Sequence, residues 1–112
     1  MLNIVKEEPN HLLVQVNLTE ANLSHADHFK DELVALLNLK KRSVWLDLGK
    51  VGYVDSSFLG ALVAALKHAI AMQCDVVLLG LQKDIEDLLK LIRLDKVFKI
   101  YSSEQEAQNA IH

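Results

Sequence analysis

The sequence predicts an α/β protein, with a mixed, partly parallel β-sheet of about four to five strands and helices packed on it. The first observation is the order of the segments. Two β-rich apolar runs come first, and after them runs with apolar residues at helical spacing alternate with further β-rich runs. The second is that residues 75–80 (DVVLLG) are almost continuously apolar, which is typical of a strand covered on both faces. A first hairpin followed by alternating helices and strands therefore indicates a mixed sheet.

The first two strands are expected near the start of the chain. Residues 2–5 form a short edge strand that stops before Pro9, because proline has no backbone N–H to give to a ladder. Residues 11–18 (HLLVQVNL) alternate from Leu12 onwards, as a strand with one buried face does. One face of that strand carries Leu12, Val14 and Val16, and the other carries Leu13, Gln15 and Asn17.

Two helices and a strand are expected in the middle of the chain. Ser24 is predicted to cap the first helix. The apolar face of this helix carries Ala26, Phe29, Leu33, Leu36 and Leu37. A β-rich run at residues 43–48 (SVWLDL) ends at Gly49 and Gly52, and a second helix is expected from about residue 56 to residue 72. The apolar stripe of this second helix is Leu59, Leu62, Val63, Leu66 and Ile70.

The remaining elements follow the buried strand at residues 75–80. Another amphipathic helix is predicted from the spacing of Ile85, Leu88, Leu89 and Ile92. Residues 96–101 (KVFKIY) are expected to form a final short strand. In the closing segment, Ser103 and Glu106 have the spacing of a capping box, in which a serine and a glutamate satisfy the free N–H groups of a helix start.

Size and composition limit the classes of function. The chain has 112 residues, of which 51% are hydrophobic, so residues 1–112 are expected to form one folded domain. A net charge of −3 argues against a surface for nucleic acid. Cys74 is the only cysteine, which excludes an intrachain disulfide and a metal site built on cysteines. No signal peptide or membrane span is recognisable, so we expect a cytoplasmic protein that does not insert into a membrane.

The most informative segment is the loop before the second helix, where Asp55, Ser56 and Ser57 interrupt a strongly apolar stretch. Aspartate and serine are common N-caps, so these residues can simply end a loop and start a helix. A serine in the first turn of a helix also lies beside free N–H groups and the positive end of the helix dipole, a favourable place for a phosphate. The residues alone leave both interpretations open.

Two segments stand out together: residues 44–69 (VWLDLGKVGYVDSSFLGALVAALKHA) and residues 76–107 (VVLLGLQKDIEDLLKLIRLDKVFKIYSSEQEA). With them the chain resembles the STAS domain, which is shared by sulfate transporters and anti-sigma factor antagonists, in its free-standing bacterial antagonist form. The first segment is similar to the family's strand, Asp-Ser-Ser-Gly-Leu-Gly loop and helix, and the second resembles its later strand, helix and closing segment. The resemblance covers most of the chain and implies a STAS-like fold.

The resemblance also implies a function. Ser56 would be the serine that a partner kinase phosphorylates with ATP, supported by Asp55 and Ser57, and a phosphoserine phosphatase would reverse the modification. The unphosphorylated form would bind an anti-sigma factor or a related serine protein kinase. The domain would then be a substrate and not an enzyme, and it would need no cofactor. The residues expected to contact the partner are Asn22, Leu23, Phe58, Leu59 and Gly60.

Three residues depart from the family's pattern. Phe58 stands where the family usually has glycine, which would place a large side chain beside Ser56, either narrowing access or offering an apolar contact. Asn22 replaces an aspartate expected near the loop, and Arg93 replaces a turn glycine. Phe58 and Asn22 motivate an alternative: a constitutive structural subunit of a larger assembly, such as a lipid-transport ATPase or a signalling complex, without a phospho-switch.

Other candidate sites carry weaker signals. His25 and His28 lie one helical turn apart, but two ligands without a third favour a solvated helix face over a metal site. No set of residues offers a general base, a metal centre or a glycine-rich phosphate loop, so enzymatic activity is not expected.

Overall fold

The computed structural model describes residues 1–111. Its main sheet has five strands in the order β1-β2-β4-β6-β7, and two further short strands, β3 and β5, form a separate ladder. The strands are β1 (Leu2–Glu7), β2 (His11–Val16), β3 (Glu20–Ala21), β4 (Ser43–Asp47), β5 (Tyr53–Val54), β6 (Val76–Leu79) and β7 (Ile100–Tyr101). The helices are α1 (Leu23–Lys40), α2 (Ser56–Ala71), α3 (Lys83–Leu91), a short 3-10 helix (Leu94–Lys96) and α4 (Glu104–Ile111).

The main sheet is mixed, which confirms the predicted fold class. β1 is antiparallel to β2, and each later neighbour in the sheet is parallel to the one before it. The pairing aligns Val14 with Leu46, Leu46 with Leu78, and Leu78 with Ile100. Because side chains at aligned positions point to the same face, this row contributes apolar side chains to a single core.

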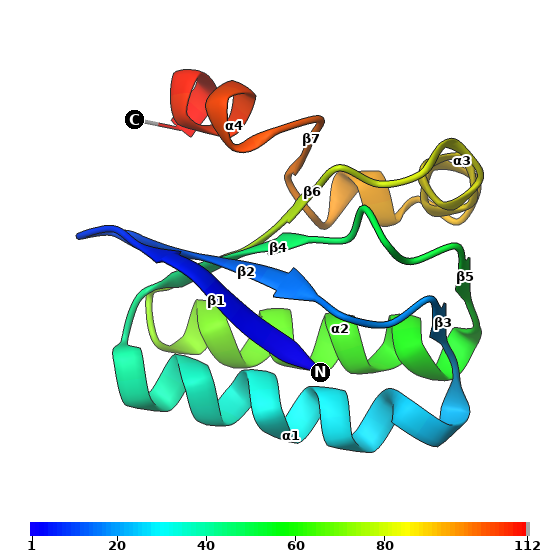
Figure 1. Cartoon of the computed structure of the whole chain (residues 1–112), viewed down its shortest axis with the longest axis horizontal. Coiled ribbons are helices and arrows are strands. Elements are labelled where there is room, and N and C mark those ends of the chain that lie inside the picture. Colours follow the sequence, from blue (N-terminus) through cyan, green and yellow to red (C-terminus); the bar gives the residue numbers. More distant parts are fainter. Residues whose placement is uncertain (112) are drawn as a thin grey trace.

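Helices α1 and α2 lie side by side across one face of the sheet (Figure 1). Helix α1 buries Phe29, Leu33 and Leu37 there, and α2 buries Phe58 and Leu62. The Phe29 and Phe58 rings are 4.5 Å apart between centroids. This face therefore holds the larger core and fixes where α2 begins.

The opposite face of the sheet carries α4 (Figure 1). A smaller apolar cluster lies between this helix and the sheet. Trp45, Val77 and Leu79 are buried there together with Ala107 of α4. All four residues of β6 are buried, so the prediction of a strand covered on both faces is confirmed. The buried His11 ring stacks on Trp45, with 3.5 Å between the ring centroids.

Two details of the helices differ from the prediction. The N-cap of α1 is Asn22 and not Ser24, because the Asn22 side chain accepts a hydrogen bond from the Ser24 amide. In α2 the buried face includes Ala61, Ala65 and Ala69, whereas Ile70 is 59% exposed. Small alanines allow α2 to approach its neighbours closely, and a prediction based on large aliphatic residues therefore placed Ile70 on the wrong side of the helix.

Two further details concern the strands. The final strand is only Ile100–Tyr101, because the amide of Phe98 still donates to the carbonyl of Leu94 and the chain remains in a turn until that point. That turn buries the Phe98 ring in the core. The ladder of β3 and β5 was not predicted, because each strand has just two residues and lacks a recognisable alternation.

Arg93 follows α3 with φ at 66°, in the left-handed region that glycine occupies without strain. The residue is exposed and begins the 3-10 turn. Its substitution for a turn glycine therefore affects a surface helix end on α3, as expected.

Candidate functional site at the start of helix α2

The loop before α2 is held against the start of α1 by backbone pairing. In the ladder of β3 and β5, Glu20 aligns with Tyr53 and Ala21 with Val54. The pairing extends on both sides, since Gly52 N donates to Thr19 O at 2.9 Å and Asp55 N donates to Ala21 O at 3.1 Å. These bonds join two segments that are far apart in sequence, and they bring the first turns of α1 and α2 together.

The carboxylate of Asp55 satisfies a free amide at each of these two helix starts. Oδ1 accepts a hydrogen bond from Phe58 N at 3.0 Å, which makes Asp55 the N-cap of α2. Oδ2 accepts a hydrogen bond from Leu23 N, the first residue of α1, at 2.8 Å. Asp55 is thus a structural link between two helices as well as a cap, a role that sequence spacing alone did not indicate.

Ser56 is the first residue of α2 and its side chain is exposed. Because Asp55 performs the capping, the Ser56 hydroxyl forms no hydrogen bond with any of residues 1–111. It lies where the free amides and the dipole of α2 favour an added anion. Ser57, the next residue, is half-buried.

Two of the expected partner-contact residues prove to be part of the core. Phe58 is fully buried against Phe29, so it neither narrows the approach to Ser56 nor offers an apolar surface contact. Leu59 is 7% exposed and belongs to the same core. The first turn of α2 points both large side chains inward, between α1 and the sheet, which is not the exposure expected of contact residues; their contact with a partner stays a prediction.

The other expected contact residues lie at the surface. Leu23 is 72% exposed, and Gly60 is exposed with open space where a side chain would project. Asn22 is half-buried, and its side chain is occupied by capping α1. Tyr53 of β5 is 53% exposed. It was not predicted as a contact residue, because the sequence indicates only a loop before the second helix.

No group of three or more potential metal ligands occurs among residues 1–111. His25 is half-buried and His28 is exposed, and neither ring has a cluster of further ligands around it in that part of the chain. None of the helices described for residues 1–111 is both long and apolar enough to cross a membrane.

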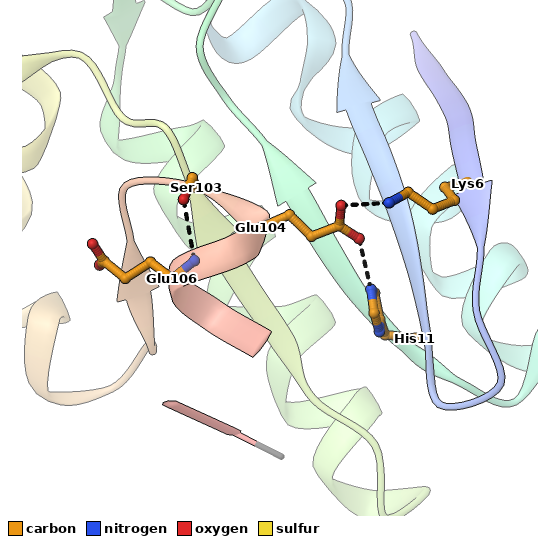
Figure 2. A network of polar contacts seen from close by, with 5 residues as sticks. All are labelled: Lys6, His11, Ser103, Glu104 and Glu106. Atoms are coloured by element: carbon orange, nitrogen blue, oxygen red, sulfur yellow. Dashed lines mark hydrogen bonds and ion pairs between the residues drawn. The ribbon is translucent and has the colours of Figure 1, made fainter. Parts of the chain in front are cut away.

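A second polar cluster lies on the other face of the sheet (Figure 2). Lys6 and His11 both point toward the carboxylate of Glu104, with Lys6 Nζ at 2.7 Å from Oε1 and His11 Nε2 at 3.1 Å from Oε2. Burial acts to raise the pKa of Glu104, but the hydrogen bonds from Lys6 and His11 outweigh it and hold that pKa below its ordinary value. The cluster fastens α4 to the hairpin of β1 and β2.

The start of α4 also contains the predicted capping box, with one difference. Glu106 N donates to Ser103 Oγ at 3.1 Å, as expected. The Glu106 carboxylate, however, accepts from the amide and hydroxyl of Ser102, at 3.1 and 2.7 Å, and not from the amide of Ser103. The Ser102 hydroxyl and then its amide hold the pKa of Glu106 below its ordinary value.

Comparison with known proteins identifies the family. The sequence pattern of the STAS domain matches residues 4–107. The chain belongs to the STAS domain family.

Three relatives illustrate the similarity. BtrV of Bordetella bronchiseptica, assigned as an anti-sigma factor antagonist, is 26% identical over 89 residues, which cover 80% of this chain and 77% of BtrV. The crystal structure of TM1081 of Thermotoga maritima, assigned to the same class, has a TM-score of 0.81 and 26% identity, and covers 99% of this chain and 92% of that one. Phosphorylated Bacillus SpoIIAA shares the fold, with a TM-score of 0.72, 11% identity and full coverage of both chains.

Proposed function

We propose that this STAS domain is an anti-sigma factor antagonist that is switched at Ser56. In the unmodified state it binds an anti-sigma factor or a related serine kinase through the surface around the start of α2, and phosphorylation of Ser56 ends that binding. The observation that carries the proposal is the exposed Ser56 hydroxyl, which is free of intramolecular hydrogen bonds with residues 1–111. The general role is supported by BtrV and TM1081, whose assigned class is the same.

The chemistry of the switch needs no catalytic group from this domain. The partner kinase transfers the γ-phosphoryl group of ATP to Ser56 Oγ, the hydroxyl proton is lost, and ADP leaves. The product carries roughly 1.5 to 2 additional negative charges at that position. A phosphoserine phosphatase hydrolyses the phosphate ester and restores the serine. The amides at the start of α2 stabilise the added charge, so the modified helix remains folded while its surface becomes acidic.

The surroundings of Ser56 suit a protein partner. Leu23 and Tyr53 supply exposed apolar side chains on the neighbouring elements, and large exposed apolar residues are typical of interaction surfaces. Along α2, the exposed residues Gly60 and Ala64 continue from Ser56 at intervals of one turn. Their small side chains allow a partner to approach the helix closely. Asn22 supports this surface by capping α1 and does not itself need to touch the partner.

The direct test uses the kinase and ATP. The protein is incubated with its cognate kinase, and phosphate is mapped by mass spectrometry in the wild type, in Ser56→Ala and in the matched control Ser57→Ala. We expect one phosphate on the wild type and on Ser57→Ala, and none on Ser56→Ala. Binding of the kinase should persist in Ser56→Ala and be lost in Ser56→Asp. An absence of phosphate together with equal binding by the two Ser56 variants would rule out the switch.

The alternative is a constitutive structural subunit of a larger assembly, such as a lipid-transport ATPase. Its motivation was the pair of departures at Phe58 and Asn22. Phe58 is buried and Asn22 caps α1, so neither residue obstructs Ser56. These observations favour the switch. Capture of a transporter ATPase to the same extent by Ser56→Ala and Ser56→Asp would instead support the structural role.

A further inference from the structure

The starts of α1 and α2 share one carboxylate, and that carboxylate belongs to the residue next to Ser56. Asp55 Oδ2 accepts from Leu23 N at 2.8 Å, and Asp55 Oδ1 accepts from Phe58 N at 3.0 Å. Leu23 is also a strongly exposed apolar residue at the first position of α1. The position of Leu23, a candidate docking residue, therefore depends on the carboxylate of Asp55, which is adjacent in sequence to any charge added at residue 56.

A phosphate on Ser56 competes with Asp55 in two ways. Its oxygens seek the amides in the first turn of α2, and one of these amides, Phe58 N, is already bound by Asp55. Its charge also repels the carboxylate of the adjacent residue, since two negative charges held close together at a protein surface repel each other. Both effects move the Asp55 carboxylate away from its present position between the two helices.

We propose that Asp55 transmits phosphorylation of Ser56 to α1: the phosphate displaces the Asp55 carboxylate, the hydrogen bond to Leu23 N is lost, and Leu23 is no longer held in place. Asp55 is then a positioning residue whose bond to Leu23 exists in the unmodified state and is absent in the phosphorylated state. The inference rests on the proposed function, because it describes how modification of that same serine changes the docking surface.

The effect is confined to one amide. The next amide of α1, Ser24 N, is bound by Asn22 Oδ1 at 3.1 Å, and His25 N is bound by Asn22 O at 3.0 Å. These bonds do not involve Asp55, so α1 stays folded when Leu23 is released. Ser24 N lies in the same turn as Leu23 N and is an internal control for any general loosening of α1.

Asp55→Asn is the matched variant for the test. Asparagine caps helices about as well as aspartate, so the variant keeps the start of α2. An asparagine side chain has a single acceptor oxygen, and therefore it cannot accept from Leu23 N and Phe58 N with separate oxygens. The variant removes one end of the link without removing the cap, and its urea unfolding curve verifies that the fold is retained.

The experiment measures amide hydrogen exchange by NMR in four full-length proteins: the wild type and Asp55→Asn, each with serine or a genetically installed phosphoserine at position 56. In the wild-type background, we expect the phosphate to accelerate exchange at Leu23 N by about tenfold or more, as the loss of a hydrogen bond to a charged acceptor predicts. Exchange at Ser24 N should change little. In the Asp55→Asn background, exchange at Leu23 N should already be fast, and the phosphate should add no more than a factor of about two.

Two results would overturn the inference. The first is unchanged exchange at Leu23 N when phosphoserine is installed in the wild-type background. The second is an equal acceleration in the wild-type and Asp55→Asn backgrounds, because a merely structural Asp55 would leave the effect of the phosphate independent of it. The phosphoserine is installed without a kinase, so the exchange experiment tests only the role of Asp55. The kinase assay alone decides the proposed function, and its failure would not change the interpretation of the exchange rates.

Discussion

Helices α2 and α4 both begin at serine-rich segments, but their serines have different roles. At α4, Ser103 is the cap itself and its Oγ accepts from Glu106 N, while the Ser102 hydroxyl donates to the Glu106 carboxylate. At α2, the cap is Asp55, and Ser56 follows it with its hydroxyl unengaged by residues 1–111. The hydroxyl of a serine that caps a helix is occupied by a hydrogen bond to the helix, whereas the hydroxyl of Ser56, which follows an aspartate cap, can be modified without breaking such a bond.

The two helix starts also differ in how they are anchored. The first turn of α2 inserts Phe58 into the main core, whereas the only buried residue that α4 contributes within the described chain is Ala107. Helix α4 is fastened instead by the polar cluster of Lys6, His11 and Glu104. The start of α2 is thus anchored in the core beneath an exposed serine, whereas the start of α4 depends on the ionised carboxylate of Glu104.

The largest effect is expected at Phe58. Phe58→Ala should lower the free energy of unfolding by about 3–5 kcal/mol, because it removes a fully buried ring from the main core. Urea denaturation measures the change, and Phe58→Leu, which keeps an apolar side chain, should lose clearly less. A loss below about 1 kcal/mol for Phe58→Ala would mean that the start of α2 is not anchored in the core as described.

The caps of α2 and α4, Asp55 and Ser103, should contribute unequally to the free energy of unfolding. Asp55→Ala should cost about 2 kcal/mol of unfolding free energy, since it removes hydrogen bonds at two helix starts. Ser103→Ala removes the cap bond of α4 alone and should cost about 1 kcal/mol. The same urea measurements compare the two variants. Equal losses would show that the bond from Leu23 N to Asp55 contributes nothing to stability.

A smaller loss of stability is expected when the pH is lowered, because Glu104 of α4 becomes protonated. Glu104 has a pKa held below the ordinary 4.5, so the stability that its ionised form provides is complete above that pH and is lost as the pH falls through the folded-state pKa. Unfolding midpoints in urea should therefore decline below about pH 4.5 in the wild type and decline less in Glu104→Gln. Glu32→Gln, on α1, serves as the control and should follow the wild type.

The smallest effect is expected at Ser56. Ser56→Ala should change the free energy of unfolding by no more than about 0.5 kcal/mol, because the hydroxyl is exposed and forms no hydrogen bond with the described residues. Thermal and urea unfolding both test this expectation. A loss similar to that of Ser103→Ala would place Ser56 among the structural serines and remove the contrast between the two helix starts.

The sheet and the position of the loop could be predicted because their signals are local. The alternation of Leu12, Val14 and Val16 depends on strand geometry alone, and these residues are buried as expected. Asp55 directly before an apolar helical run is likewise a local sign of a helix start, and the structure begins α2 at Ser56. Patterns that repeat every two or every three to four residues need no knowledge of the neighbouring elements.

The errors arose where burial is decided by distant elements. Phe58 was expected to place its side chain beside Ser56, as an obstacle or an apolar contact, but the ring packs instead against Phe29 of α1. Asp55 reaches Leu23, 32 residues away in sequence, and His11 reaches Glu104, 93 residues away. The spacing of residues along the sequence does not predict these contacts, because they depend on the order of the strands in the sheet and on the ladder of β3 and β5.

Trp45 is the only tryptophan in the chain, and it lies beneath α4 with the His11 ring stacked on its face. The Glu104 carboxylate of α4 holds the His11 ring, and Ala107 of α4 belongs to the same buried cluster as Trp45, so the departure of α4 would change the surroundings of the indole. The emission of this protein is therefore a built-in optical gauge of whether the C-terminal helix is seated, and it can be followed without any attached dye. The sheet separates Trp45 from α1 and α2, so its emission should not change when residue 56 is modified.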